Sequence, residues 1–195
     1  MTDAPRNGTP VEEPATPDAA REMAFHPLLV DLAERFPHAV FDVVAPPAAP
    51  SQDEVRVPVP IQDEVQLPVA QFADFMAAAR EAGYETFLDL CAVDYLRRNP
   101  RFEVVAHVLA TAVPHRLRVR IGVPASNPSV PSITSVYPGA NFYEREAYDL
   151  FGIAFDGHPD LTRILMPDDW EGHPLRKDEA VGSVPVQFKG SHKAS

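Results

Sequence analysis

The sequence has only one cysteine, Cys91. One thiol cannot hold an iron–sulfur cluster or a structural zinc ion, since both need several ligands, and it cannot form an internal disulfide. Cys91 lies in the apolar run FLDLCAVDYL, which predicts a small buried core residue rather than a reactive thiol. We therefore expect no bound redox centre on cysteine.

Glycine is also scarce, and its nine residues never form a G-x-G pattern, so the dinucleotide-binding fingerprint is absent. Gly152 and Gly157 have the spacing of P-loop glycines, but His158 and Pro159 follow where Lys and Ser or Thr would be needed. The sequence contains no G-x-S-x-G and no H-E-x-x-H pattern. The sequence thus lacks these motifs of hydride, phosphoryl and acyl transfer.

Basic residues are few: 17 Lys and Arg stand against 28 Asp and Glu, and the net charge is -11. A nucleic-acid-binding protein needs a basic surface to displace counterions, so the composition argues against that function. It also disfavours direct adsorption to an anionic membrane. The longest uncharged stretch, 121–143, is broken by prolines and is not expected to span a membrane. The N-terminus has no apolar segment of the signal-peptide type, so we expect no secretion.

Proline, in contrast, is abundant, with 22 residues. Residues 1–23 are rich in Pro, Asp, Glu, Thr and Ala, which predicts a disordered tail. Residues 24–157 predict an α+β domain in which helices pack on one antiparallel or mixed sheet. Residues 158–195 predict an extended C-terminal arm, because prolines and glycines interrupt any helix or strand period.

Apolar periodicity predicts the elements of the domain. A period of about 3.6 residues predicts helices at 27–36, 70–82 and 142–151. Alternation and short apolar runs predict strands at 39–45, 54–61, 85–96, 101–110 and 116–123.

The helix 142–151 carries a cluster of charges. Arg145 and Asp149 are one turn apart on the face opposite the apolar stripe, which predicts a solvent-exposed ion pair. Glu144 and Glu146 flank the same arginine, which would hold the carboxylates ionised. This favours a salt-bridge network over acid–base catalysis.

The arm combines apolar and basic side chains. Trp170 and several leucines are side chains that dominate protein interfaces, and they must lie either on the chain's own domain or on another protein. Arg163, Arg176 and Lys177 can pair with acidic groups of a partner. The composition therefore predicts an arm that docks on other proteins.

A metal site is the alternative. His158, Asp160 and His173 could bind a divalent ion, as in a stand-alone metal-dependent hydrolase. A proline-broken segment separates the two histidines, and no helix sets the ligand geometry. Hydrogen-bonded or solvent-facing histidines are therefore the favoured interpretation.

The run EREAYDLFGIAFDGHPDLTRIL, followed by DDWEGHPLRKD, resembles the signature of the 30-kDa subunit of respiratory complex I, NADH:quinone oxidoreductase, known in bacteria as its C subunit. The resemblance covers 144–178 without a gap, and a weaker one extends back to about residue 70. Thr162, where a basic residue or proline is usual, and Glu179 and Ala180, where an aromatic and a proline are common, depart from the pattern. The signature residues that we expect at partner interfaces are Glu144, Arg145, Glu146, Asp149, Gly152, His158, Pro159, Asp160, Arg163, Trp170, Pro174, Arg176, Lys177 and Asp178.

The resemblance implies a structural subunit in the peripheral arm of a proton-translocating enzyme, at the cytoplasmic face of the cell membrane. Such a subunit binds no FMN and no iron–sulfur cluster, which are expected in partner subunits. The expected partners are the quinone-site subunit, which is 49-kDa or D-like, and the cluster-bearing B- and I-like subunits. Neither nucleic acid nor direct membrane insertion is expected. The equivalent subunit of a related membrane-bound hydrogenase or ferredoxin-linked complex is the alternative.

Overall fold

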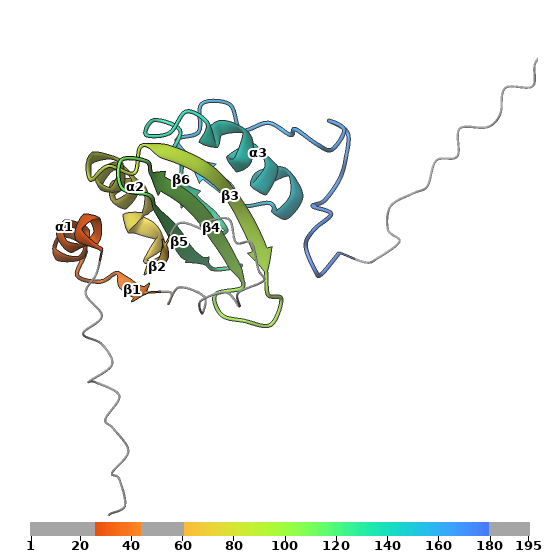
Figure 1. Ribbon diagram of the computed structural model, residues 1–195. Helices are drawn as coiled ribbons and strands as arrows, with labels where there is room; N and C mark the ends of the chain where they lie inside the picture. Colours follow the sequence, from red (N-terminus) through yellow and green to blue (C-terminus); the bar gives the residue numbers. More distant parts are fainter. Residues whose placement is uncertain (1–25, 44–60, 180–195) are drawn as a thin grey trace, which may run out of the picture.

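The computed structural model describes residues 26–43 and 61–179 of the chain (Figure 1). The predicted disorder of 1–23 and most of the predicted strand 54–61 lie outside this part. Within it, the elements follow in the order α1 (Pro27–Arg35), β1 (Val40–Val43), β2 (Ile61–Leu67), the short 3-10 helix η1 (Val69–Gln71), α2 (Phe72–Glu81), β3 (Thr86–Asp94), β4 (Phe102–Ala110), β5 (His115–Val123), β6 (Ser129–Pro131), α3 (Ala140–Phe151) and β7 (Ala154–Asp156).

The main sheet has five strands in the order β1-β2-β5-β4-β3. Neighbouring strands run antiparallel except β2 and β5, which run parallel. The predicted α+β class with a mixed sheet is therefore confirmed. The strands β6 and β7 form a second, two-stranded parallel sheet, which the sequence pattern did not predict.

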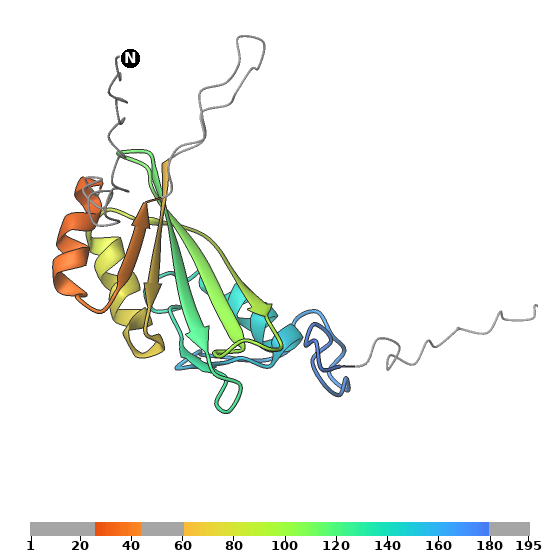
Figure 2. The same ribbon diagram turned by 90° about the horizontal axis from the view of Figure 1, so that it is seen from below.

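One face of the sheet carries the hydrophobic core. In β5, Leu117, Val119 and Ile121 are fully buried, while Arg118 and Arg120 point to the opposite face. The helices α1 and α2 lie together beside the β1–β2 end, whereas α3 packs against β3 (Figure 2). The core is continuous across both ends of the sheet.

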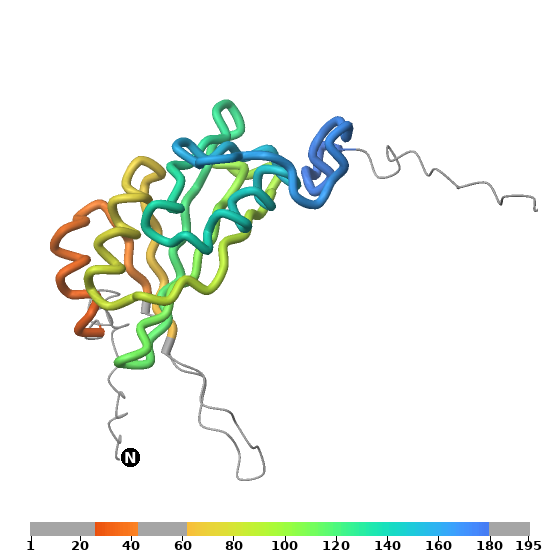
Figure 3. The backbone as a smooth tube through the Cα atoms, turned by 90° about the horizontal axis from the view of Figure 1, so that it is seen from above, coloured from red at the N-terminus to blue at the C-terminus, as the bar shows by residue number. Residues whose placement is uncertain are grey.

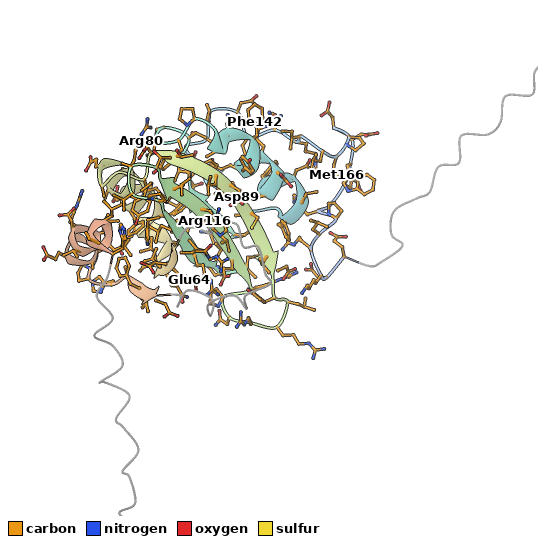
Figure 4. All side chains as sticks on the ribbon, in the orientation of Figure 1. Glu64, Arg80, Asp89, Arg116, Phe142 and Met166 are labelled. Atoms are coloured by element: carbon orange, nitrogen blue, oxygen red, sulfur yellow. The ribbon has the colours of Figure 1, made fainter. Side chains whose placement is uncertain are left out.

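The opposite face of the sheet is charged. Arg120 pairs with Glu64 of β2 and Glu103 of β4, and His107 lies 2.6 Å from Asp89 of β3. Glu64, Arg116 and Asp89 lie across three strands (Figure 4). Contacts between charged side chains of neighbouring strands thus cover the face opposite the hydrophobic core.

Two local predictions need correction. Cys91 is exposed rather than buried, because Leu90 points to the core and the next residue of a strand must point away from it. The strand β2 begins where the predicted strand 54–61 ends. Its inward positions include Asp63, a buried carboxylate that interrupts the apolar alternation.

A buried polar network explains Asp63. His115 is fully buried, with Nδ1 2.7 Å from the Tyr84 hydroxyl and Nε2 3.1 Å from a carboxylate oxygen of Asp63. The His26 ring stacks on His115 at 4.0 Å. Burial, with the nearby His26, lowers the pKa of His115 despite the opposing effect of Asp63. The folded chain therefore binds a proton on His115 less readily than the unfolded chain does.

This network predicts a loss of stability in mild acid. The unfolded chain takes up a proton on His115 near pH 6.5, whereas the folded chain resists protonation to a lower pH. The free energy of unfolding should therefore fall as the pH drops below 6.5. Urea unfolding on both sides of this pH measures the slope. The variant His115→Gln should show a flatter slope in the same range, and an unchanged slope would contradict the assignment.

Candidate partner-docking site

The helix α3 ends at Gly152, as predicted. Gly152 has a φ of 71°, and its N–H donates to the carbonyl of Tyr148 at 2.8 Å. A left-handed glycine at this position stops the helix and redirects the chain. The arm then returns along α3 and bends beyond the last turn of the helix (Figure 3).

Asp149 anchors the arm to the end of α3. Its side chain is fully buried, and one carboxylate oxygen accepts the N–H groups of Ile164, Leu165 and Met166 at 2.8–3.0 Å. The other oxygen accepts from the Arg163 guanidinium at 2.7 Å. Burial alone would raise the pKa of Asp149, but the four hydrogen bonds outweigh it and lower the pKa to about 2.

Further hydrogen bonds fix this region of the arm. Arg163 also donates to the carbonyl of Gly172 at 3.1 Å. His173 Nδ1 lies 3.0 Å from the backbone carbonyl of Asp149, and the N–H of Leu175 donates to the carbonyl of Leu150 at 3.0 Å. Both sides of the bend at 167–171 are therefore fastened to the last turn of α3.

The predicted ion pair between Arg145 and Asp149 is wrong. Arg145 instead donates to the backbone carbonyls of Thr162 and Arg163 at 3.1 and 3.0 Å. The ion pair of Asp149 is with Arg163, 14 residues further along the chain. Arg145 and Asp149 thus hold the same stretch of the arm from two points on the helix.

The predicted salt-bridge network around Arg145 is also wrong. Glu144 is fully buried and accepts from the Ser132 hydroxyl at 2.7 Å and the N–H of Ile133 at 2.8 Å. Burial raises the pKa of Glu144. Glu146 is exposed, and no ion pair joins it to a residue of the described part. Glu144 therefore fixes the loop before α3 rather than acting with Arg145.

A second anchor joins the arm to the β3–β4 hairpin. Asp94 is almost fully buried, binds Arg101 through both oxygens at 2.9 and 2.7 Å, and accepts the N–H of Lys177 at 2.8 Å. Arg101 also binds Asp178 at 2.9 and 2.6 Å. The guanidinium of Arg101, through its hydrogen bonds above all, holds the pKa of Asp94 well below its usual range.

The sequence pattern did not reveal Asp94 and Arg101 as part of this site. They lie 77 or more residues from their partners in the arm, and no local pattern signals such a contact. The basic residues expected to reach a partner are partly used within the chain: Arg163 pairs with Asp149, and Arg176 lies 3.6 Å from Asp178.

The residues of the alternative metal site are not brought together. His158 Nδ1 accepts the N–H of Asp160 at 3.0 Å, and its Nε2 lies 3.3 Å from the carbonyl of Asn141, in the first turn of α3. His173 contacts Asp149, at the other end of this helix. Across 26–43 and 61–179, the structure has no group of three or more His, Cys, Asp or Glu side chains that could hold a metal ion.

The anchored arm exposes apolar side chains. Ile164, Leu165 and Leu175 are 37%, 59% and 51% exposed, although their backbone N–H groups are bonded to α3. We call these three residues the apolar patch. Met166 follows the patch residues 164 and 165. It lies beyond the C-terminal end of α3, whereas Phe142 lies toward the other end of this helix (Figure 4). A fixed backbone with outward apolar side chains is suited to binding another protein, because little entropy remains to be lost.

Gly152 offers a test of this arrangement. A Cβ atom there would lie 2.6 Å from the His173 ring, whereas a Cβ on Gly157, which also has a positive φ of 86°, would meet nothing within 4 Å. Gly152→Ala should lower the free energy of unfolding by about 3 kcal/mol and Gly157→Ala by about 1 kcal/mol. Denaturant unfolding of both variants measures the difference. Equal losses would show that His173 does not pack as described.

Comparison with known proteins decides the family. The model of the family described as "Respiratory-chain NADH dehydrogenase, 30 Kd subunit" matches residues 50–184, which include both anchors and the described arm. This chain belongs to that family. The resemblance found in the sequence is thus confirmed.

Relatives and solved structures agree with this 30-kDa family membership. The C subunit of NADH-quinone oxidoreductase from Roseiflexus castenholzii is 54% identical over 120 residues, covering 62% of this chain and 69% of the relative. The C subunit of the Salinispora tropica enzyme is 47% identical over 124 residues, covering 63% of this chain and 51% of the relative. A trypsin-resistant fragment of Nqo5 is 30% identical, with a TM-score of 0.55, covering 68% of this chain and 96% of the fragment.

A more distant structure shares the fold alone. A chain of the membrane-bound sulfane sulfur reductase, an archaeal respiratory membrane complex, is 22% identical, with a TM-score of 0.63, covering 85% of this chain and 95% of that chain. In the part of the present chain that the structure describes, no helix has the length and apolar character needed to cross a membrane.

Proposed function

We propose that this chain is a structural subunit, without redox groups of its own, in the peripheral arm of a proton-translocating NADH:quinone oxidoreductase. Its role is to position the quinone-site subunit, 49-kDa or D-like, and the cluster-bearing B- and I-like subunits. The complex lies at the cytoplasmic face of the cell membrane. FMN and the iron–sulfur clusters belong to the partner subunits.

The observation that carries this proposal is the apolar patch on an immobilised arm. Asp149 fixes the backbone of the arm at 163–166, and Asp94 fixes it at Lys177. Two buried carboxylates thus hold the backbone so that Leu165 and Leu175 point outward, where the described residues leave 59% and 51% of these side chains exposed. Apolar side chains presented in this way gain free energy when another protein covers them. The match to the 30-kDa family and to relatives named as the C subunit of NADH-quinone oxidoreductase supports the proposal that the partners are other subunits of such a complex.

Affinity purification of the tagged full-length chain from native membranes tests the proposal. We expect subunits of an NADH:quinone oxidoreductase to be recovered, including those that carry clusters. Recovery of hydrogenase or ferredoxin-linked subunits would favour the related complex instead. Recovery of the chain as a solitary monomer would contradict both.

The absence of redox groups has a separate test. The chain purified alone should show no visible absorbance from flavin or clusters and should not oxidise NADH. Zinc or manganese bound in stoichiometric amounts would instead revive the metal-dependent hydrolase. Flavin or iron bound in stoichiometric amounts would refute the structural role.

A further inference from the structure

The bend of the arm places acidic residues next to the apolar patch. We call 167–171 the acidic turn. Met166 before it is bonded to Asp149, and Gly172 after it is bonded to Arg163, so both ends of the turn are fixed. The turn carries Asp168, Asp169 and Glu171 around the half-buried Trp170. The patch residues Leu165 and Leu175 flank it in the sequence.

The arginines and the lysine that the structure describes in the arm, at 158–179, form no ion pair with this turn. Arg163 is paired with Asp149, and Arg176 lies next to Asp178. Among the Arg and Lys residues described in the arm, at 158–179, Lys177 is the one that forms no ion pair with a described residue. The arm carboxylates that likewise have no ion pair in the described part of the chain are Asp160, Asp168, Asp169, Glu171 and Glu179.

We propose that the arm docks on a protein surface where basic residues border an apolar hollow. This inference rests on the proposed function and adds the chemistry of the partner surface. The leucines of the apolar patch fill the hollow, and the carboxylates of the acidic turn face the basic border. An acidic or anionic surface would be repelled, since like charges brought together in a contact cost several kcal/mol. The exposed leucines beside the turn argue against a turn that faces only water, because neighbouring exposed apolar side chains mark contacts with other proteins.

The geometry also explains why the acidic turn is fixed. Asp168, Asp169 and Glu171 repel one another, and a mobile segment would spread them apart. The bonds from Asp149 and Arg163 hold the turn in one conformation before binding. Charges held in place lose less entropy on binding, so they contribute more to selectivity for a basic partner.

Charge reversal tests the acidic turn. The full-length tagged chain replaces the native copy, and subunits are quantified after purification from membranes. The triple variant Asp168→Lys, Asp169→Lys, Glu171→Lys should recover partner subunits at least about tenfold less than the wild type. The control variant Glu34→Lys, Asp42→Lys, Asp74→Lys makes the same change of net charge at acidic positions elsewhere in the domain. It should stay within about twofold of the wild type.

The outcomes separate the two proposals. If the wild type recovers no complex subunits, the proposed function fails. If the wild type recovers them and both triple variants match it, or both lose them equally, the basic border is wrong. Thermal unfolding of each variant checks that it folds. A wild-type complex washed at rising ionic strength gives a second measurement: recovery should fall with salt, and salt-independent recovery would overturn the proposal.

A matched pair of variants tests the apolar hollow. Leu165→Asp places a charge in the patch, whereas Val113→Asp does the same at a turn residue that is 50% exposed, compared with 59% for Leu165. Leu165→Asp should reduce recovery of partner subunits by at least about tenfold, because the carboxylate would be desolvated on docking. Val113→Asp should leave recovery within about twofold of the wild type. Equal recovery of the two variants would rule out docking through the patch.

Discussion

Replacing Asp149 by asparagine is expected to lower the free energy of unfolding by about 3–5 kcal/mol, the cost of breaking a buried ion pair by removing one partner. The amide keeps the size of the side chain but loses the charge that binds Arg163. One of its two positions becomes a donor, so it cannot accept all four of the present hydrogen bonds. The backbone of the arm at 164–166 should then separate from α3.

Two measurements check this result. Denaturant unfolding gives the loss of stability, and hydrogen exchange should show faster exchange of the amides of Ile164, Leu165 and Met166. The control Asp160→Asn changes an exposed carboxylate of the same arm and should alter stability by less than about 0.5 kcal/mol. Protected amides at 164–166 in Asp149→Asn would show that this carboxylate does not hold the arm.

The second large effect is expected at Asp94. Asp94 and Asp178 both bind Arg101, but their side chains are 1% and 50% exposed. Asp94→Asn should cost about 3 kcal/mol, because the buried arginine contact loses its charge and the N–H of Lys177 loses a charged acceptor. Asp178→Asn should cost less than about 1 kcal/mol, since its charge is screened by solvent.

Urea unfolding of these two variants provides the comparison. Because both aspartates bind Arg101 and differ in burial, the comparison separates the effect of burial from that of the ion pair itself. Similar losses in the two variants would mean that Arg101, rather than the buried carboxylate, determines the stability of this corner. Asp94→Asn should also increase hydrogen exchange at Lys177, whereas Asp178→Asn should not.

Much of the domain could be predicted from periodicity. Strand β5 alternates arginines with Leu117, Val119 and Ile121, and this pattern alone identifies a sheet with one buried face. The helix α3 and its end at Gly152 also follow from local signals. The strand β2 does not follow from local signals, because Asp63 occupies an inward position. Its burial is possible because its carboxylate is bonded to His115.

The site itself was less predictable, for a physical reason. Helical spacing assigns a charged residue to the solvent face, and it predicts that Asp149 lies there with Arg145. Its burial depends on three N–H groups from residues 15–17 positions later, and no local pattern carries that information. The sequence does contain one relevant signal: a segment after Arg163 with neither helix nor strand period, whose N–H groups must find acceptors elsewhere. Family resemblance pointed to the same residues without giving their contacts.

These contacts refine the expected role of the signature residues. Asp149, Arg163 and Asp178 bind within the chain, so their first effect is to shape the arm. Residues such as Asp160 and Lys177 keep exposed side chains that are available for contacts with a partner. Variants of Asp149 and Arg163 should therefore change stability strongly and Asp178→Asn by less than about 1 kcal/mol, whereas variants of the second group should change assembly alone.

Site-specific photo-crosslinking in native membranes is the most direct test of the docking arm. A benzophenone side chain at Leu165 should form an adduct with another subunit of the assembled complex, identified by mass spectrometry, while the same group at Val113 serves as the surface reference. An assembled complex in which position 165 forms no adduct, or an adduct with its own chain only, would contradict the account.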